Sequence, residues 1–186
     1  MAATVQWNAS GDIERSLPVP NAQLLLWFLL ATIAMLFAAF TSAYFIRRTG
    51  ADWDPVTLPS LLWFNTAILV ASSVVLEIGK RPGRSRQRAL LWTSVLGIGF
   101  VVGQVAAWMI MVRQGILLPN QPHAAFFYIV SGLHGLHLLG GLVLLAVAIV
   151  STRRKPGDNT IMNCFTTYWH FLAALWIGLL VLLALG

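Results

Sequence analysis

The stretch of sequence that decides the fold runs from Ala124 to Val150 and reads AAFFYIVSGLHGLHLLGGLVLLAVAIV. Its 27 residues include no Asp, Glu, Lys or Arg. A hydrocarbon core about 30 Å thick is crossed by ~20 helical residues, so this stretch is long enough to span a membrane as a helix. Strands of a membrane barrel would instead show about ten residues of alternating apolar and polar side chains. The stretch therefore predicts a transmembrane helix.

Four further windows have a sufficient length and the same lack of charge. They are residues 22–46, 58–76, 89–112 and 161–185. All 18 charged side chains of the 186-residue chain lie outside the five windows. Charged residues make up 10% of the chain, against roughly a quarter in a soluble domain, which excludes a soluble fold. We therefore expect an all-α, polytopic membrane protein built as a bundle of five transmembrane helices.

The positions of the cations predict how the chain is oriented. Nine lie in the N-terminal tail and in the second and fourth connections, namely Arg15, Lys80, Arg81, Arg84, Arg86, Arg88, Arg153, Arg154 and Lys155. The other side of the membrane has only three, Arg47, Arg48 and Arg113. By the positive-inside rule, residues 1–21 form a cytoplasmic tail, and residues 22–186 form a single transmembrane domain whose C-terminus is external. The net charge of +6 thus reflects topology, and we expect no nucleic-acid partner.

Polar side chains inside or at the ends of the windows carry the remaining chemical information. The sequence contains no phosphate-binding loop, no Ser/His/Asp set and no paired carboxylates, so it predicts no catalytic residue. We expect the polar residues to be buried, with structural or helix-packing roles. They are Asn65, Glu77, Gln104, His134, His137 and His170.

The three histidines allow two interpretations. His134 and His137 are three residues apart on one helical face and would look towards His170 on the next antiparallel helix. Such a group would suit a haem or a metal ion. Alternatively, the side chains form hydrogen bonds between helices. We favour the second interpretation because the single Cys164 cannot build a thiolate site and no carboxylate lies at that depth.

Two other features concern the membrane surface and helix packing. Glu77 lies near the inner surface, where we expect it to be hydrated or paired with Lys80 or Arg81. Gly99 and Gly103, with Ala107, place small residues four apart, a pattern typical of close helix contacts.

The motifs also resemble those of a known family. In chain order they are Ser42-Ala-Tyr-Phe-Ile-Arg-Arg48, Trp53, Pro55, Leu58-Pro59, Trp63-Phe-Asn-Thr66, Ser72-Ser73 leading to Glu77, Gly103-Gln104, Trp108, Gly132-Leu-His-Gly-Leu-His137, Gly140-Gly141, Tyr168-Trp-His-Phe171 and Trp176. This ordered set resembles the subunit III family of haem-copper oxidases in its short, five-helix prokaryotic form.

The resemblance implies a non-catalytic core subunit of a respiratory terminal oxidase, cytochrome c oxidase, in a bacterial cell (inner) membrane. Such a chain packs against subunit I, assembles with subunit II and other respiratory subunits, and holds phospholipid. It supports aerobic electron transport and oxygen reduction. Haem and copper belong to the partner subunits, so we expect no cofactor or metal in this chain. The family's topology agrees with the one derived from charge.

The resemblance also suggests residues that meet lipid headgroups, and it exposes two departures. Trp53 and Trp63, near the span ends, and Arg153, near the family's basic residue, are the candidate lipid contacts. Ile33 and Ala173 stand where the family commonly has membrane-embedded carboxylates. Their absence favours a structural, lipid-holding role over proton handling.

Other functions stay open at this stage. Within the family, the chain would also suit a quinol oxidase or a nitric oxide reductase. An independent b-type cytochrome or a transporter is a further alternative. A transporter is disfavoured because the spans hold no charge and the sequence shows no inverted repeat.

Overall fold

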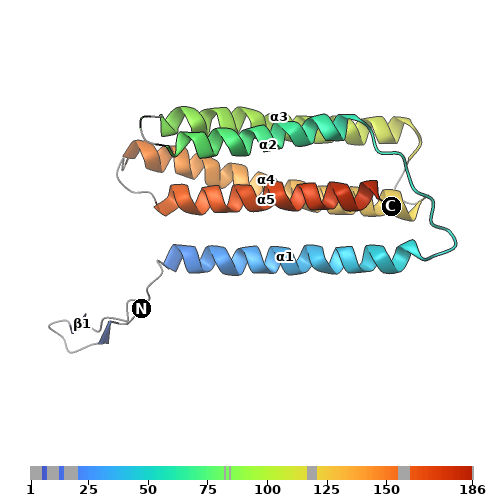
Figure 1. Ribbon diagram of the computed structural model, residues 1–186, viewed down its shortest axis with the longest axis horizontal. Helices are drawn as coiled ribbons and strands as arrows, with labels where there is room; N and C mark the ends of the chain where they lie inside the picture. Colours follow the sequence, from blue (N-terminus) through green and yellow to red (C-terminus); the bar gives the residue numbers. More distant parts are fainter. Residues whose placement is uncertain are drawn as a thin grey trace.

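The protein folds into long helices that run side by side. The computed structural model describes residues 6–7, 13–14, 21–81, 83, 85–116, 121–154 and 160–185. Within these residues the helices are α1 (Asn21–Arg48), α2 (Leu61–Gly79), α3 (Arg86–Arg113), α4 (Pro122–Arg154) and α5 (Thr160–Ala184), shown in Figure 1. Each of the five is long and apolar enough to cross a membrane. The prediction of five membrane-spanning helices is confirmed.

The all-α prediction is confirmed for the bundle, and the N-terminal tail adds one very short strand pairing. Strands β1 (Gln6–Trp7) and β2 (Ile13–Glu14) pair antiparallel, with Gln6 opposite Glu14 and Trp7 opposite Ile13. This two-residue ladder lies outside the helical bundle (Figure 1). Hydrophobic periodicity does not predict so short a pairing, because only two residues on each strand take part.

The helix ends differ from the charge-free windows by one to four residues. Helix α3 begins at Arg86 and ends at Arg113, because a charge marks the membrane surface and not the last backbone hydrogen bond. The side chain of Ser85 caps this helix by accepting a hydrogen bond from the Arg88 backbone N–H at 3.4 Å. Helix α2 begins at Leu61, three residues after the start of its window, with Ser60 as its N-cap and Pro59 before the cap.

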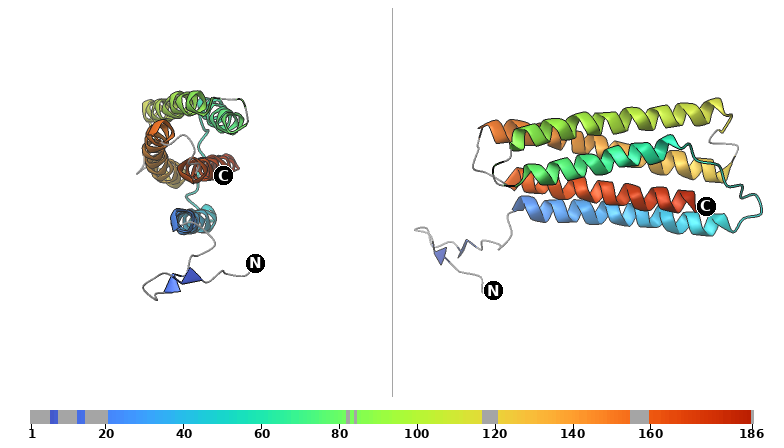
Figure 2. Two further views of the ribbon diagram at one scale, coloured as in Figure 1. Left: turned by 90° about the vertical axis from the view of Figure 1, so that its left-hand side faces the viewer. Right: turned by 45° about the horizontal axis from the view of Figure 1, so that its top comes forward.

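Four of the helices form a closed ring, and the fifth lies beside it. Helices α2, α3, α4 and α5 each contact two neighbours in the order α2–α3–α4–α5–α2. Helix α1 contacts only α4 and α5 among the described elements. The end-on view in Figure 2 shows α1 standing apart from the other four. We call the end of the bundle at which α1 begins the near end, and the end at which α1 stops the far end.

The core lies within the ring and along one stripe of α1. Its largest buried side chains include Trp169, Trp176 and Phe100. Helix α1 contributes buried Ile33 and Phe37, whereas its opposite face exposes large apolar side chains. The most exposed of these are Leu25, Phe28, Met35 and Ile46. Such an outer face is expected for a helix in contact with lipid or another subunit.

Glycine permits the closest approach of α2 to α3. A Cβ atom added at Gly79 would overlap Ala89, and one added at Gly103 would overlap the side-chain amide of Asn65. A Cβ atom at Gly99 meets nothing within 4 Å. The predicted small-residue contact is therefore made at Gly103, while Gly99 faces open space.

This difference supplies a matched pair of variants. We expect Gly103→Ala to lower the free energy of unfolding by about 1–3 kcal/mol, because the Asn65 amide must leave its partner on α3. Gly99→Ala should leave stability unchanged or raise it slightly, since alanine favours the helix. Thermal unfolding of the purified chain in mild detergent measures both, and equal effects would contradict this account of α2–α3 packing.

Candidate functional site

A layer of polar side chains lies inside the ring. Asn65 on α2 donates from Nδ2 to the Phe100 carbonyl at 3.0 Å and to Gln104 Oε1 at 3.4 Å, both on α3. Asn65 and Gln104 are buried. The amide groups therefore join α2 to α3 at the point where Gly103 lets the helices approach.

Two indoles of α5 extend this layer to α2. Trp169 Nε1 donates to Ser72 Oγ at 2.9 Å, and Trp176 Nε1 donates to Thr66 Oγ1 at 3.0 Å. From one pair to the next the residue number increases along α5 and decreases along α2, as antiparallel helices require. Ser72 also joins α3, because its carbonyl accepts from Thr93 Oγ1 at 3.5 Å. These side-chain hydroxyl groups thus join three helices through hydrogen bonds.

His134 occupies the centre of the ring without a hydrogen-bond partner in the described structure. Its side chain is fully buried, and neither ring nitrogen has a partner. The imidazole instead lies against the rings of Trp176, at a centroid distance of 5.0 Å, and Phe100, at 6.1 Å. Its contacts here are those of an aromatic packing residue.

The three predicted histidines do not gather. His137 is half-buried; its Nδ1 lies 2.7 Å from the Leu133 carbonyl of the preceding turn, and its ring packs edge-on against Phe37 of α1. His170 Nε2 lies 3.3 Å from Glu77 Oε2 of α2. The alternative in which His134 and His137 face His170 is therefore not observed. The favoured interpretation, hydrogen bonds between helices, holds for His170 but is wrong for His134, which has no partner in the described structure, and for His137, whose bond stays within α4. Among the described residues, no three His, Cys, Asp or Glu side chains form a group able to hold a metal ion.

The predicted burial is also wrong for Glu77 and His170, whose side chains are 54% and 39% exposed. Glu77 follows the fully buried Leu76 and is therefore rotated by about 100° away from the interior. Side chains tilt toward the start of their own helix, so antiparallel α2 and α5 direct these two groups at each other. The expected ion pair between Glu77 and Lys80 is present, with Lys80 Nζ 3.3 Å from Glu77 Oε2. This pair lies where α2 ends, at the near end of the bundle.

His123, which the sequence analysis did not select, connects two distant segments of the chain. His123, at the start of α4, accepts a hydrogen bond on Nδ1 from the Val56 backbone N–H at 3.0 Å. Nε2 therefore carries the proton and donates to the Leu183 carbonyl at 3.1 Å. One buried imidazole thus ties the α1–α2 connection to the end of α5. The residue precedes the charge-free window, which is why the sequence reading omitted it.

The candidate lipid contacts differ in their surroundings. Trp53 packs edge-on against Tyr44 and His123 in an aromatic cluster at the far end. Trp63 is 54% exposed and lines a cavity of about 450 Å³ beside Pro55 and Leu58. Arg153 lies in α4, but its side chain falls outside the described residues. Ile33 and Ala173, at which the resemblance led us to expect carboxylates in the family, are buried in the apolar core.

The unpartnered imidazole gives a testable consequence. We expect His134→Phe to preserve the free energy of unfolding or raise it by about 1–2 kcal/mol, because it removes two buried nitrogens without partners and keeps an aromatic ring. His134→Ala should lower it by about 2–4 kcal/mol through the cavity left beside Trp176. Thermal unfolding compares them; strong destabilisation by His134→Phe would indicate a bound partner at the imidazole.

Comparisons with known proteins agree on one family. The family model described as cytochrome c oxidase subunit III matches residues 21–185. A probable cytochrome c oxidase subunit 3 of Nocardia farcinica is 31% identical over 163 aligned residues, and the match covers 81% of this chain and 80% of that protein.

Two further relatives show a similar extent of identity. Cytochrome c oxidase subunit 3 of Synechocystis is 31% identical over 85% of this chain and 72% of its own length. Cytochrome c oxidase subunit 3 of Thermostichus vulcanus is 31% identical over 86% of this chain and 84% of its own length. The family model covers every helix of the bundle, and the chain belongs to the cytochrome c oxidase subunit III family.

Proposed function

We propose that this chain is a non-catalytic core subunit of a bacterial cytochrome c oxidase that packs against subunit I, holds phospholipid and stabilises the complex during oxygen reduction. The observation that carries the proposal is the family match across residues 21–185. Haem and copper are supplied by partner subunits, subunit I in direct contact and subunit II in the same complex. The site of action is the inner membrane.

The described polar side chains support a scaffold role. Asn65, Ser72 and Thr66 are used in hydrogen bonds between neighbouring helices. A transporter requires polar groups along a path across the membrane, and an ionisable residue at its centre is the usual marker. Here Glu77 and His170 lie at the outside of the ring. His134 lies inside it, but packs against the rings of Trp176 and Phe100 and has no hydrogen-bond partner among the described residues with which to continue a polar path.

The exposed apolar face of α1 supports packing in a larger assembly. Leu25, Phe28, Met35 and Ile46 are each at least 70% exposed in the isolated chain. Helix α1 contacts only two of the other helices. We propose that lipid and subunit I cover the surface that the chain leaves open.

The proposal predicts a defined set of partners. An affinity-tagged chain, solubilised in mild detergent, should bring down a haem-containing subunit I and subunit II, and the complex should oxidise cytochrome c. A harsher detergent should release the tagged chain without a haem spectrum. Purification of the tagged chain without any haem-containing polypeptide would contradict the assignment, while a b-type spectrum retained by the isolated chain would favour an independent cytochrome.

Electron donors separate the oxidase classes within the family. The named relatives are cytochrome c oxidase subunits, so we propose cytochrome c as the donor of the complex. Oxidation of quinol alone, or reduction of nitric oxide in place of oxygen, would instead assign the chain to a quinol oxidase or a nitric oxide reductase.

The orientation gives a separate prediction. The connection between α2 and α3 contains Lys80 and Arg81 and precedes Arg86 of α3, and it lies at the near end. We propose that this end faces the cytoplasm. A reporter active only in the cytoplasm should be active when fused at Gly83 and inactive when fused after Gly186. The opposite pattern would reverse the topology without affecting the family assignment.

A further inference from the structure

His123 lies where three segments of the chain meet at the far end of the bundle. Its Nδ1 accepts a hydrogen bond from the Val56 backbone N–H of the α1–α2 connection at 3.0 Å. Its Nε2 donates to the Leu183 carbonyl near the end of α5 at 3.1 Å. The residue is 1% exposed. We call Val56, His123 and Leu183 the His123 bridge, and it joins His123 to positions 67 and 60 residues away along the chain.

The hydrogen bond from Val56 requires a neutral imidazole. A backbone N–H only donates, so Nδ1 has to offer a lone pair. A neutral ring with its proton on Nε2 makes both hydrogen bonds of the bridge. A protonated ring has two N–H donors and no acceptor, so its Nδ1–H would meet the Val56 N–H. One added proton therefore removes the hydrogen bond and places two donors against each other.

A cavity beside the bridge supplies both access and room for this change. It has a volume of about 450 Å³, and all three members of the His123 bridge line it. Trp63, whose side chain is 54% exposed, lines the same cavity, so the cavity reaches the surface. One water molecule occupies about 30 Å³ in the liquid, so protons carried by water reach the buried imidazole. The connection also has space into which it can move.

Charged groups of both signs surround the imidazole. Arg48 of α1 opposes a positive charge on His123, whereas Asp54 of the connection favours it. Tyr44 of α1, whose ring centroid lies 6.1 Å from that of His123, has a buried hydroxyl without a hydrogen-bond partner in the described structure. Residues 181–185 of α5 carry no ionisable side chain. Among these residue types, histidine is the one that ordinarily changes its charge between about pH 5 and pH 8.

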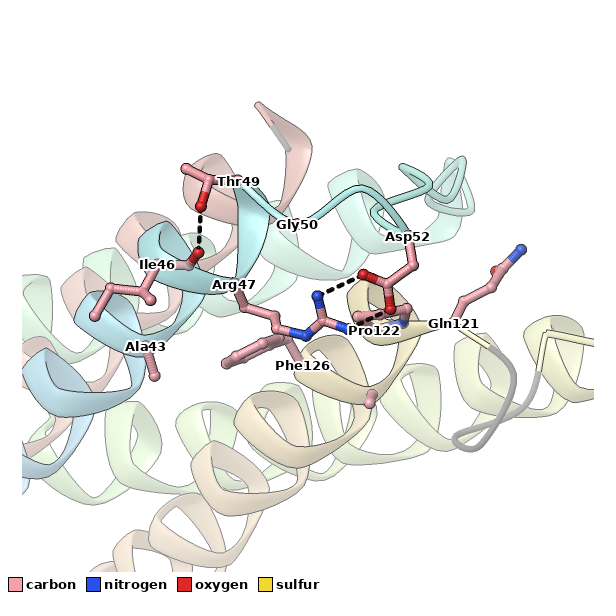
Figure 3. Close-up of a pocket in the computed structure, with 10 residues that line it drawn as sticks. Ala43, Ile46, Arg47, Thr49, Gly50, Asp52, Gln121, Pro122 and Phe126 are labelled. Atoms are coloured by element: carbon pink, nitrogen blue, oxygen red, sulfur yellow. Dashed lines mark hydrogen bonds and ion pairs between the residues drawn. The ribbon is translucent and has the colours of Figure 1, made fainter.

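A second anchor of the same connection keeps its charge over that range. Figure 3 shows the Arg47–Asp52 pair beside Gln121 and Pro122, which immediately precede His123. Arg47 Nη1 donates to Asp52 Oδ1 at 2.7 Å. The hydrogen bonds from Arg47 hold the pKa of the Asp52 carboxyl below its usual range, so the pair persists at about pH 5. Release of the connection in this range therefore starts at the His123 bridge.

We propose that the His123 bridge is a pH-dependent switch, in which protonation of the imidazole breaks the hydrogen bond from Val56 and releases the α1–α2 connection from the far end of the bundle. Helix α1 contacts only α4 and α5 among the described elements, and this connection is one of the constraints on its far end. In the proposed topology the far end is external, so the switch responds to acid outside the cytoplasm. The inference goes beyond the proposed function and requires no partner subunit.

Hydrogen exchange tests the switch on the full chain, purified in mild detergent with the subunits that accompany it. Mass spectrometry follows the peptide that contains Val56 at about pH 8 and at about pH 5. Each rate is divided by the intrinsic exchange rate at that pH, so that protection is compared. We expect the protection of the Val56 N–H in wild type to fall about tenfold at the lower pH, the loss of one hydrogen bond.

Two substitutions at His123 separate its hydrogen bond from its charge. His123→Asn offers an amide oxygen near the position of Nδ1 and does not titrate, so the protection of Val56 should be the same at both pH values. His123→Leu offers no acceptor, so protection should be low at both. His170→Gln removes a histidine at the near end and should keep the wild-type response. Thermal unfolding confirms that each variant is folded, and if His123→Leu does not fold, His123→Asn decides the question.

The outcomes separate this switch from the proposed function. Equal protection of Val56 at the two pH values in wild type would overturn the switch, as would a full pH response in His123→Asn. Copurification of a haem-containing subunit I is scored in the same preparation and bears on the oxidase assignment alone. The exchange measurement gives its answer whether or not that subunit is present.

Discussion

The hydrocarbon of the membrane is the constraint on which this structure depends. It offers no hydrogen bond to a polar group, so every backbone group in a span is satisfied within a helix and charged side chains lie at the ends. The same constraint acts on the polar side chains that remain. Asn65, Thr66 and Ser72 lie inside the ring of α2 to α5, where another helix supplies their partners.

These hydrogen bonds explain how an apolar bundle acquires a defined packing. Leucine side chains pack equally well against lipid tails and against protein, so hydrophobicity alone does not select neighbours within a membrane. Interhelical hydrogen bonds contribute about 0.6 kcal/mol each on average, which is modest individually. These hydrogen bonds instead fix how α5 is set against α2. The indoles of Trp169 and Trp176 reach the hydroxyl groups of α2 in only one register of the two helices.

Helix α1 shows the complementary situation. It contributes a narrow buried stripe, with Ile33 and Phe37, and has few contacts with the ring. Its opposite face is apolar and exposed, and its far end lines a cleft together with the start of α4. A helix held in this way leaves most of its surface open to further contacts. This fits a chain that works as part of a complex rather than alone.

The sequence by itself determined the number of spans, the ends to which charges are confined and, through ordered motifs, the family. These depend on local length, composition and spacing. Only the tertiary structure decided that His170 pairs with Glu77, that His134 packs against Trp176, and that His123 joins two distant segments. Each depends on how a helix is rotated about its axis and set against its neighbour. In a nearly uniform apolar helix, the sequence carries little information about that rotation, so the partners become visible only when the helices are packed.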